Sequence, residues 1–219
     1  MSGFIQFKTP GQGTAAITHN PSAWVLQAED VAAWHDAQAM LAQAREEAQS
    51  LPRLVQPFLQ RITAGTEEIA YLGVVDGDDT VFIARSDSHR HTSSGYLPGS
   101  RLQVQVTAAG LAVLASMDEA LMDQWLDTHE LRSFTSYTIA SKAALRQALI
   151  HFKHQGWAVS EQQLELNFRG IAVPLLDRNN VAHGAISVTM PINREVTDHA
   201  LHRLLPVMQE AARNLRPLL

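Results

Sequence analysis

Two apolar stretches flank a polar tetrapeptide in RGIAVPLLDRNNVAHGAISVTMP, residues 169–191, which predicts two strands joined by a polar turn at 177–180. On the second strand, Ala185, Ser187 and Thr189 share one face. The opposite face carries Ile186, Val188 and Met190. Hydroxyl side chains two positions apart on an otherwise apolar strand favour the wall of a small polar pocket. The same hydroxyls could instead form hydrogen bonds within the sheet.

The front of the chain predicts an arm followed by two helices. Residues 1–28 have no sustained period, and we expect a loosely structured arm with a short strand at 4–7. Residues 30–50 are rich in Ala, Gln and Glu, which favours a helix, and the Ser-Leu-Pro sequence at its end predicts a break. A second helix is expected over 51–62, with a kink or a harmless lost hydrogen bond at Pro57.

The remaining pattern predicts strands that pair locally. Two apolar runs around an Asp-Gly-Asp-Asp turn predict a hairpin over 68–86. Residues 101–115 pass from a strand-like stretch into a small-residue helix start and then an apolar helix. Further helices are expected over 118–127, 142–155 and 197–215. Locally paired strands between helices predict an α+β domain around an antiparallel sheet.

Composition narrows the class of protein. With 46% hydrophobic and 18% charged residues, the 219-residue chain fits a globular protein with a substantial core. The absence of cysteine excludes a disulfide framework, a thiolate nucleophile and cysteine-ligated zinc. No apolar run reaches the roughly 20 residues of a membrane helix, and the N-terminus lacks a secretion signal. We therefore expect a cytoplasmic protein with no membrane partner.

Six motifs, in order and spacing, make residues 50–217 resemble the effector-binding domain of IclR-type transcriptional regulators. The motifs are LPRLVQPFLQRI, VFIARS, GSRL with TAAG, FTSYTIAS, GWAVSEQQ with FRGIAVPLLD, and GAISVTMP. The resemblance implies a GAF/PAS-like antiparallel sheet flanked by helices and preceded by an N-terminal arm and a linker-type helix. It divides the chain into an arm and linker-type helix over 1–49 and an effector-binding domain over 50–219.

The resemblance also implies a ligand, a small organic acid that is aromatic in several members. Its carboxylate would meet backbone amides at Ala108, Ala109 and Gly110. This placement agrees with elementary electrostatics, because a helix N-terminus offers unpaired N–H groups and a partial positive charge. No cofactor is implied.

Side-chain contacts carried over from the family fall on Ser187 and Thr189, with two further positions at Ser160 and Gly170. Because Gly170 leaves a wall position without a side chain, we expect room for a bulkier acid, aromatic or branched. Arg101 is a candidate anchor, since a guanidinium binds a carboxylate through two hydrogen bonds.

Other arginines and aromatic residues have a structural interpretation. Arg85 and Arg169 are more typical of structural arginines at strand ends. Tyr96, Trp125 and Trp157 could line the mouth of the pocket, but large aromatic residues more often belong to the core.

The chain departs from the family at its front. Members carry a winged helix-turn-helix there, whereas residues 1–49 are too few and hold two basic against five acidic residues. The net charge of −5 also argues against broad nucleic-acid binding. We expect DNA contact only through a winged helix-turn-helix not evident in this chain, and self-association into a homodimer or tetramer. The alternative is a stand-alone sensor or partner-binding module.

Two chemical alternatives carry less weight. The pairs His151/His154 and His199/His202 have helical spacing, but zinc needs at least a third protein ligand and no such motif is present. We expect surface histidines and no metal. An enzyme on a GAF-like fold could use Ser187 as nucleophile, yet the sequence has no G-x-S-x-G elbow and no catalytic residues are predicted.

Overall fold

The computed structural model describes residues 5–6, 15–19, 22–26, 28–88 and 95–219. The chain divides into two compact units, Met1–Leu51 and Pro52–Leu219. The boundary between the units falls inside helix α1 (Ala28–Thr66).

The first unit contains a small antiparallel sheet. Strands β1 (Ile5–Gln6), β2 (Ala15–His19) and β3 (Ser22–Leu26) pair in that order. The sequence predicted a loosely structured arm with one short strand. This was wrong for β2 and β3, which are two further strands. Each strand carries only one or two β-branched residues, so the local pattern is a weak signal for a strand although β2 and β3 pair as neighbours, with His19 opposite Ser22.

Helix α1 also corrects a prediction, since the break expected near Pro52 does not occur. A proline inside a helix loses its N–H donor and crowds the carbonyl four residues before it, at a cost of about 3 kcal/mol, but its fixed φ is compatible with a helix. On the C-terminal side of this position Val55, Leu59 and Ile62 are fully buried. Their packing outweighs the local preference to end the helix.

The second unit is built on a six-stranded antiparallel sheet in the order β6-β5-β4-β9-β8-β7. Its predicted α+β class and both predicted hairpins are confirmed. The strands are β4 (Ile69–Asp76), β5 (Asp79–Ser86), β6 (Arg101–Gln103), β7 (Ala158–Glu161), β8 (Phe168–Leu176) and β9 (Ala182–Pro191).

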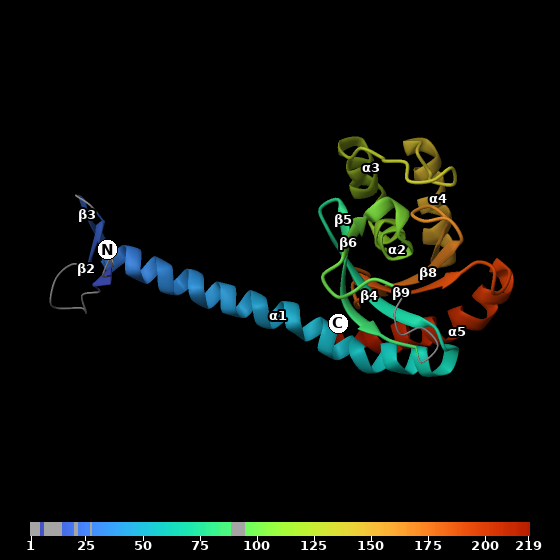
Figure 1. Ribbon diagram of the computed structural model, residues 1–219, viewed down its shortest axis with the longest axis horizontal. Helices are drawn as coiled ribbons and strands as arrows, with labels where there is room; N and C mark the ends of the chain where they lie inside the picture. The colour runs from blue at the N-terminus through green and yellow to red at the C-terminus, as the bar shows by residue number, and fades with distance from the viewer. Residues whose placement is uncertain (1–4, 7–14, 20–21, 27, 89–94) are drawn as a thin grey trace. The chain divides into compact units, whose positions relative to one another are not determined.

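Helices cover both faces of this sheet (Figure 1). One face carries α2 (Ala108–Ser116), α3 (Glu119–Thr128) and α4 (Lys142–Gln155), and the other carries α5 (Thr197–Leu215) with the part of α1 that belongs to this unit. Short 3₁₀ turns, η1 (Val104–Val106) and η2 (Arg216–Leu218), precede α2 and follow α5.

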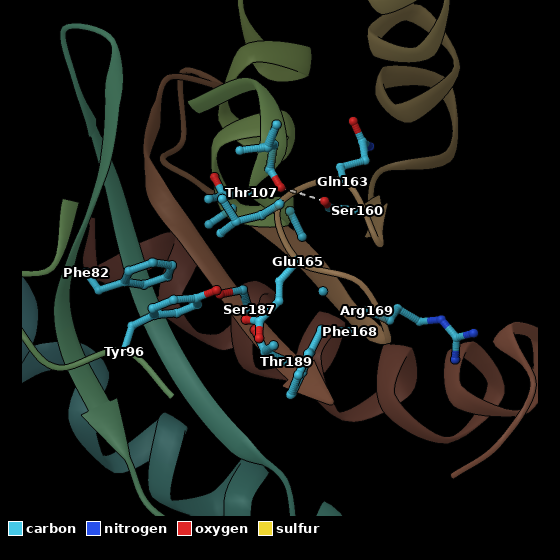
Figure 2. Close-up of a pocket in the computed structure, with 15 residues that line it drawn as sticks. Phe82, Tyr96, Thr107, Ser160, Gln163, Glu165, Phe168, Arg169, Ser187 and Thr189 are labelled. Atoms are coloured by element: carbon cyan, nitrogen blue, oxygen red, sulfur yellow. Dashed lines mark hydrogen bonds between the residues drawn. The ribbon is translucent and has the colours of Figure 1, made fainter. Parts of the chain in front are cut away.

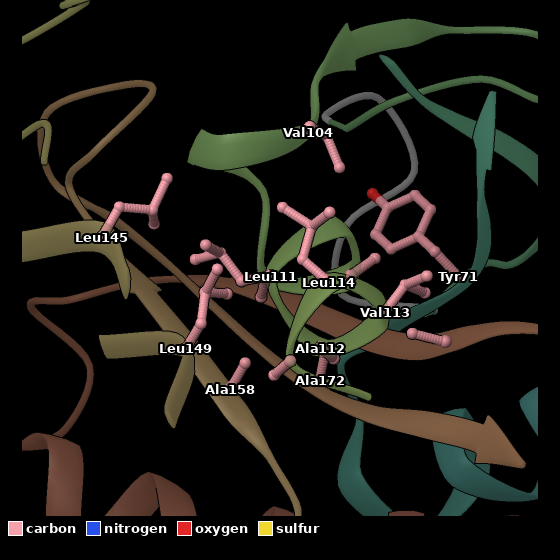
Figure 3. Close-up of a cluster of buried hydrophobic side chains, with 14 of the residues drawn as sticks. Tyr71, Val104, Leu111, Ala112, Val113, Leu114, Leu145, Leu149, Ala158 and Ala172 are labelled. Carbon is pink, nitrogen blue, oxygen red and sulfur yellow. The ribbon is translucent and has the colours of Figure 1, made fainter. Parts of the chain in front are cut away.

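Helix α2 is the centre of the core on its side of the sheet (Figure 3). All its residues from Ala108 to Ala115 are buried, as expected for a helix that is apolar all round. Small residues on the strands, Ala158, Ala172 and Ala185, are buried in the same cluster and let the helix approach the sheet. This close packing fixes the N-terminus of α2 near strands β7, β8 and β9.

Candidate functional site

The N-terminus of α2 is held by a threonine cap. The Thr107 hydroxyl accepts a hydrogen bond from the Gly110 amide at 3.1 Å and lies 2.7 Å from the Thr80 hydroxyl. An α-helix leaves the N–H groups of its first turn without intrahelical acceptors. Because the cap uses the amide of Gly110, the amides of Ala108 and Ala109 are the ones that can donate to an anion.

A pocket lies beside this first turn, with walls from β5, β7, β8, β9 and the loop between β7 and β8 (Figure 2). Six of the eight predicted site residues line the pocket, whereas Gly110 and Arg101 do not. The six are Ala108, Ala109, Ser160, Gly170, Ser187 and Thr189.

The two buried serines of the pocket differ in their hydrogen bonds. The Ser160 hydroxyl donates to the Val106 carbonyl at 2.6 Å, which ties β7 to the turn before α2. The Ser187 hydroxyl is buried, with 3% of the residue exposed, and has no hydrogen-bond partner in the described part of the chain. A buried polar group without a partner is rare in folded proteins. Ser187 is therefore the side chain best placed to bind a ligand.

Gly170 has a different role from the predicted one. A Cβ atom at this position would lie 3.0 Å from the Cβ of Ala108 and 3.8 Å from its amide nitrogen. The space beside Gly170 is thus already filled by the start of α2. The glycine lets β8 approach the helix N-terminus, and it does not enlarge the pocket for a bulkier acid.

Arg101 is not at the pocket. Its exposed side chain pairs with Asp76 at 2.8 Å and with Asp79 at 3.0 Å, which fastens β6 to the β4–β5 hairpin. The prediction that Arg101 anchors the ligand carboxylate was wrong, because its guanidinium already pairs with Asp76 and Asp79 outside the pocket.

The interpretation of Arg85 and Arg169 as structural residues is confirmed. Arg85 donates to the Tyr96 carbonyl at 3.0 Å and pairs with Asp87. Arg169 lines the pocket, but its guanidinium turns away from the pocket (Figure 2) and bonds Glu161 at 2.8 Å.

Aromatic side chains form one wall of the pocket. The rings of Phe82 and Tyr96 stack with 5.2 Å between centroids and 8° between planes, and Phe168 adds a third ring. Burial, followed by the charge of Glu165, raises the pKa of Tyr96 to about 12, so its phenol stays protonated at neutral pH. Of the aromatic residues considered from the sequence, Tyr96 lines this pocket, and Trp125 and Trp157 do not.

Sequence reasoning missed several residues of this wall. Phe82 is buried on the inner face of β5, but the sequence around it is a continuous apolar run that does not distinguish the two faces. Phe168 begins β8, and Glu165 lies in the loop between β7 and β8, where no periodic pattern applies.

The pocket is narrow. The cavity itself has a volume of about 40 Å³. Counting all the space between the lining atoms and the open mouth raises this to about 430 Å³. An apolar cavity that takes benzene has about 150 Å³. A ring-bearing ligand must therefore displace a lining side chain. Glu165 is exposed, so its side chain can move towards solvent and remain at the mouth of the pocket.

Two absences hold for the described residues. No three His, Asp or Glu side chains among them are placed to hold a metal ion. Within the same residues, no helix combines the length and apolar character needed to cross a membrane.

A pocket at a buried helix N-terminus on an antiparallel sheet is suited to a small anion. Residues 44–216 match the family described as bacterial transcriptional regulator IclR C-terminal. The chain belongs to this IclR family, as the sequence motifs predicted. The family consists of transcription regulators and not of enzymes.

Curated relatives and a solved structure support the assignment. The Pca operon regulatory protein of Acinetobacter baylyi is 32% identical over 173 residues, which are 77% of this chain and 62% of that protein. The Pca regulon regulatory protein of Pseudomonas putida is 33% identical over 161 residues, 73% of this chain and 55% of that protein. The chain thus spans less than two thirds of the length of these relatives.

The solved structure is the inducer-binding domain of a double mutant of the PobR transcription factor from Acinetobacter, in complex with 3-hydroxybenzoic acid. It is 26% identical with a TM-score of 0.72, and the match covers 77% of this chain and 98% of that domain.

Proposed function

We propose that this chain is the effector-sensing portion of an IclR-family transcription regulator and that its pocket binds a small aromatic carboxylate. The observation that carries the proposal is the hydroxyl of Ser187, which is buried in the pocket and has no hydrogen-bond partner among the described residues. A ligand oxygen would supply the missing partner.

The donors suit a carboxylate. The amides of Ala108 and Ala109 lie at the positive end of the α2 dipole, which favours a negative charge. Ser187 and Thr189 add hydroxyl donors on β9, below the same turn. The ring would lie against the aromatic wall that includes Phe82. The 3-hydroxybenzoic acid bound by the PobR domain has this combination of charge and ring.

The domain boundaries and partners belong to the same proposal. Residues 50–219 form the effector-binding domain, and the part of α1 that precedes residue 50 serves as its linker helix. Two or four copies associate, and DNA is contacted only through a winged helix-turn-helix supplied in addition to this segment. Effector binding shifts a pre-existing equilibrium between arrangements of the copies, by no more than its difference in affinity for them. As a regulator of transcription, the protein acts in the cytoplasm.

We do not assign a catalytic role to Ser187. A nucleophilic serine needs a base within hydrogen-bond reach, and the Ser187 hydroxyl has no partner of any kind in the described residues.

The test is a titration by calorimetry and thermal shift with 3-hydroxybenzoate, benzoate, succinate and the neutral 3-hydroxybenzamide. At about 100 times its dissociation constant, a bound ligand should stabilise the protein by about 2.7 kcal/mol. We expect stabilisation by an aromatic carboxylate, none by the amide, and binding about tenfold weaker in Ser187→Ala.

The matched control is Ser116→Ala, since the Ser116 hydroxyl donates to the Ala112 carbonyl at 2.8 Å and lies outside this pocket. Binding that is equally weak in both variants, or absent from the wild-type protein for every carboxylate, would contradict the proposal.

A further inference from the structure

The two ends of the pocket differ in polarity. At the α2 end, the available groups are hydrogen-bond donors, namely two backbone amides and the hydroxyl of Ser187. At the mouth, Glu165 supplies the only carboxylate among the described residues that line the pocket. Figure 2 shows the Glu165 side chain reaching into the pocket from the β7–β8 loop, whereas Arg169, a cationic residue of the lining, turns its charge away.

This carboxylate lies close to the aromatic wall. Glu165, Tyr96, Phe168 and Thr189 also line the adjoining hollow beside β4 and β9, so the four side chains surround one opening. The Tyr96 phenol stays protonated at neutral pH, partly because the negative charge of Glu165 is near it. The charge at this end of the pocket therefore belongs to Glu165.

A negative group in a pocket for anions needs a physical explanation. An effector with a carboxylate and no other polar group would be repelled by Glu165, and its ring would cover Glu165 without giving it a hydrogen bond. An unpaired carboxylate at a covered site is unfavourable, because the ligand removes its water without replacing the hydrogen bonds. An effector with a donor on the far side of its ring removes that penalty. Sites that discriminate well combine an attractive and a repulsive element in this way.

We propose that Glu165 determines the specificity of the pocket by accepting a hydrogen bond from a ring hydroxyl of the effector, so that hydroxylated aromatic carboxylates bind in preference to the unsubstituted acid. This inference rests on the proposed function and adds a second recognition point to it. The carboxylate of the effector lies at α2, and the hydroxyl lies at the mouth.

The test compares dissociation constants of benzoate, 3-hydroxybenzoate and 4-hydroxybenzoate at pH 7.5 by calorimetry. The wild-type protein should bind one of the hydroxybenzoates at least about tenfold more tightly than benzoate. In Glu165→Ala this preference should fall to within about threefold, because the hydroxybenzoate binds more weakly and benzoate more tightly. Glu165→Gln keeps an oxygen acceptor without the charge, so its preference should be intermediate.

The control is Glu130→Gln, which removes an exposed carboxylate that does not line the pocket and should leave all three constants unchanged. Because Glu165 is exposed, its variants should fold, and their thermal melts verify this. An unchanged preference in Glu165→Ala, with binding retained, would refute the role of Glu165 and leave the proposed function intact. Failure of the wild-type protein to bind any of the three acids would overturn both.

Discussion

Two buried serines line the same pocket, and their replacement by alanine should have opposite effects on the free energy of unfolding. Ser187 and Ser160 are both nearly inaccessible, at 3% and 6% exposed, and both lie on strands beside the start of α2. They differ in one respect, since Ser160 donates to the Val106 carbonyl and Ser187 has no partner among the described residues.

The magnitudes follow from that difference. Burying a hydroxyl without a hydrogen bond costs about 1–3 kcal/mol on the scale of protein mutations. Ser187→Ala removes this cost, and we expect the free energy of unfolding to rise by about 1 kcal/mol. Ser160→Ala loses a buried bond of 2.6 Å and should lower it by about 1–2 kcal/mol. The two variants should therefore differ by about 2–3 kcal/mol.

The assay is equilibrium unfolding in urea, followed by circular dichroism, with equal slopes required for the comparison. The same proteins are then titrated with 3-hydroxybenzoate, for which Ser187→Ala should bind about tenfold more weakly although it is more stable. This combination is typical of a binding group that is unfavourable for folding. Equal losses of stability in both variants would refute the reasoning, because they would show that Ser187 has a structural partner.

The remaining predictions concern three other contacts of the pocket. Gly170→Ala places a Cβ 3.0 Å from the Cβ of Ala108, so the free energy of unfolding should fall by about 1 kcal/mol. The affinity for 3-hydroxybenzoate should also weaken. An unchanged titration would show that α2 can move without affecting binding. Thr107→Ala removes the cap of α2 and should lower the free energy of unfolding by about 1–2 kcal/mol. Thr107→Ser keeps the hydroxyl and should retain most of the wild-type stability. Urea unfolding of both variants tests this, and equal losses would contradict it. A hydrogen bond from Arg169 lowers the pKa of Glu161 below its ordinary 4.5, so this carboxylate stabilises the fold above that pH and the contribution is lost as the pH falls through the lowered value. The melting temperature of Glu161→Gln should decline less steeply on acidification than that of the wild-type protein, and identical slopes would contradict the assignment.

Local patterns in the sequence predicted the strand that carries Ser187. Period-two alternation is a short-range signal, and it placed Ser187 and Thr189 on the face of β9 that lines the pocket. The small residues at the start of α2 were equally readable, since Thr107 and the alanines after it lie within one turn of helix.

Contacts between distant segments could not be read in this way. Arg101 lies a few residues before the TAAG segment that begins the site, but its partners are set by the register of β5 and β6, which brings Asp79 opposite Gln103. Gly170 suggested empty space only because the sequence does not show that Ala108 packs against it. Glu165 belongs to a connecting loop, and its position depends on how β7 and β8 pair.

The most direct test of the account observes the backbone amides at the start of α2 during a titration. In a ¹⁵N–¹H correlation spectrum, adding 3-hydroxybenzoate should shift the Ala108 and Ala109 signals downfield until saturation. The Gly110 amide, which already donates to Thr107, should move less. Saturable binding that leaves the Ala108 and Ala109 signals in place would contradict the central claim that α2 holds the carboxylate.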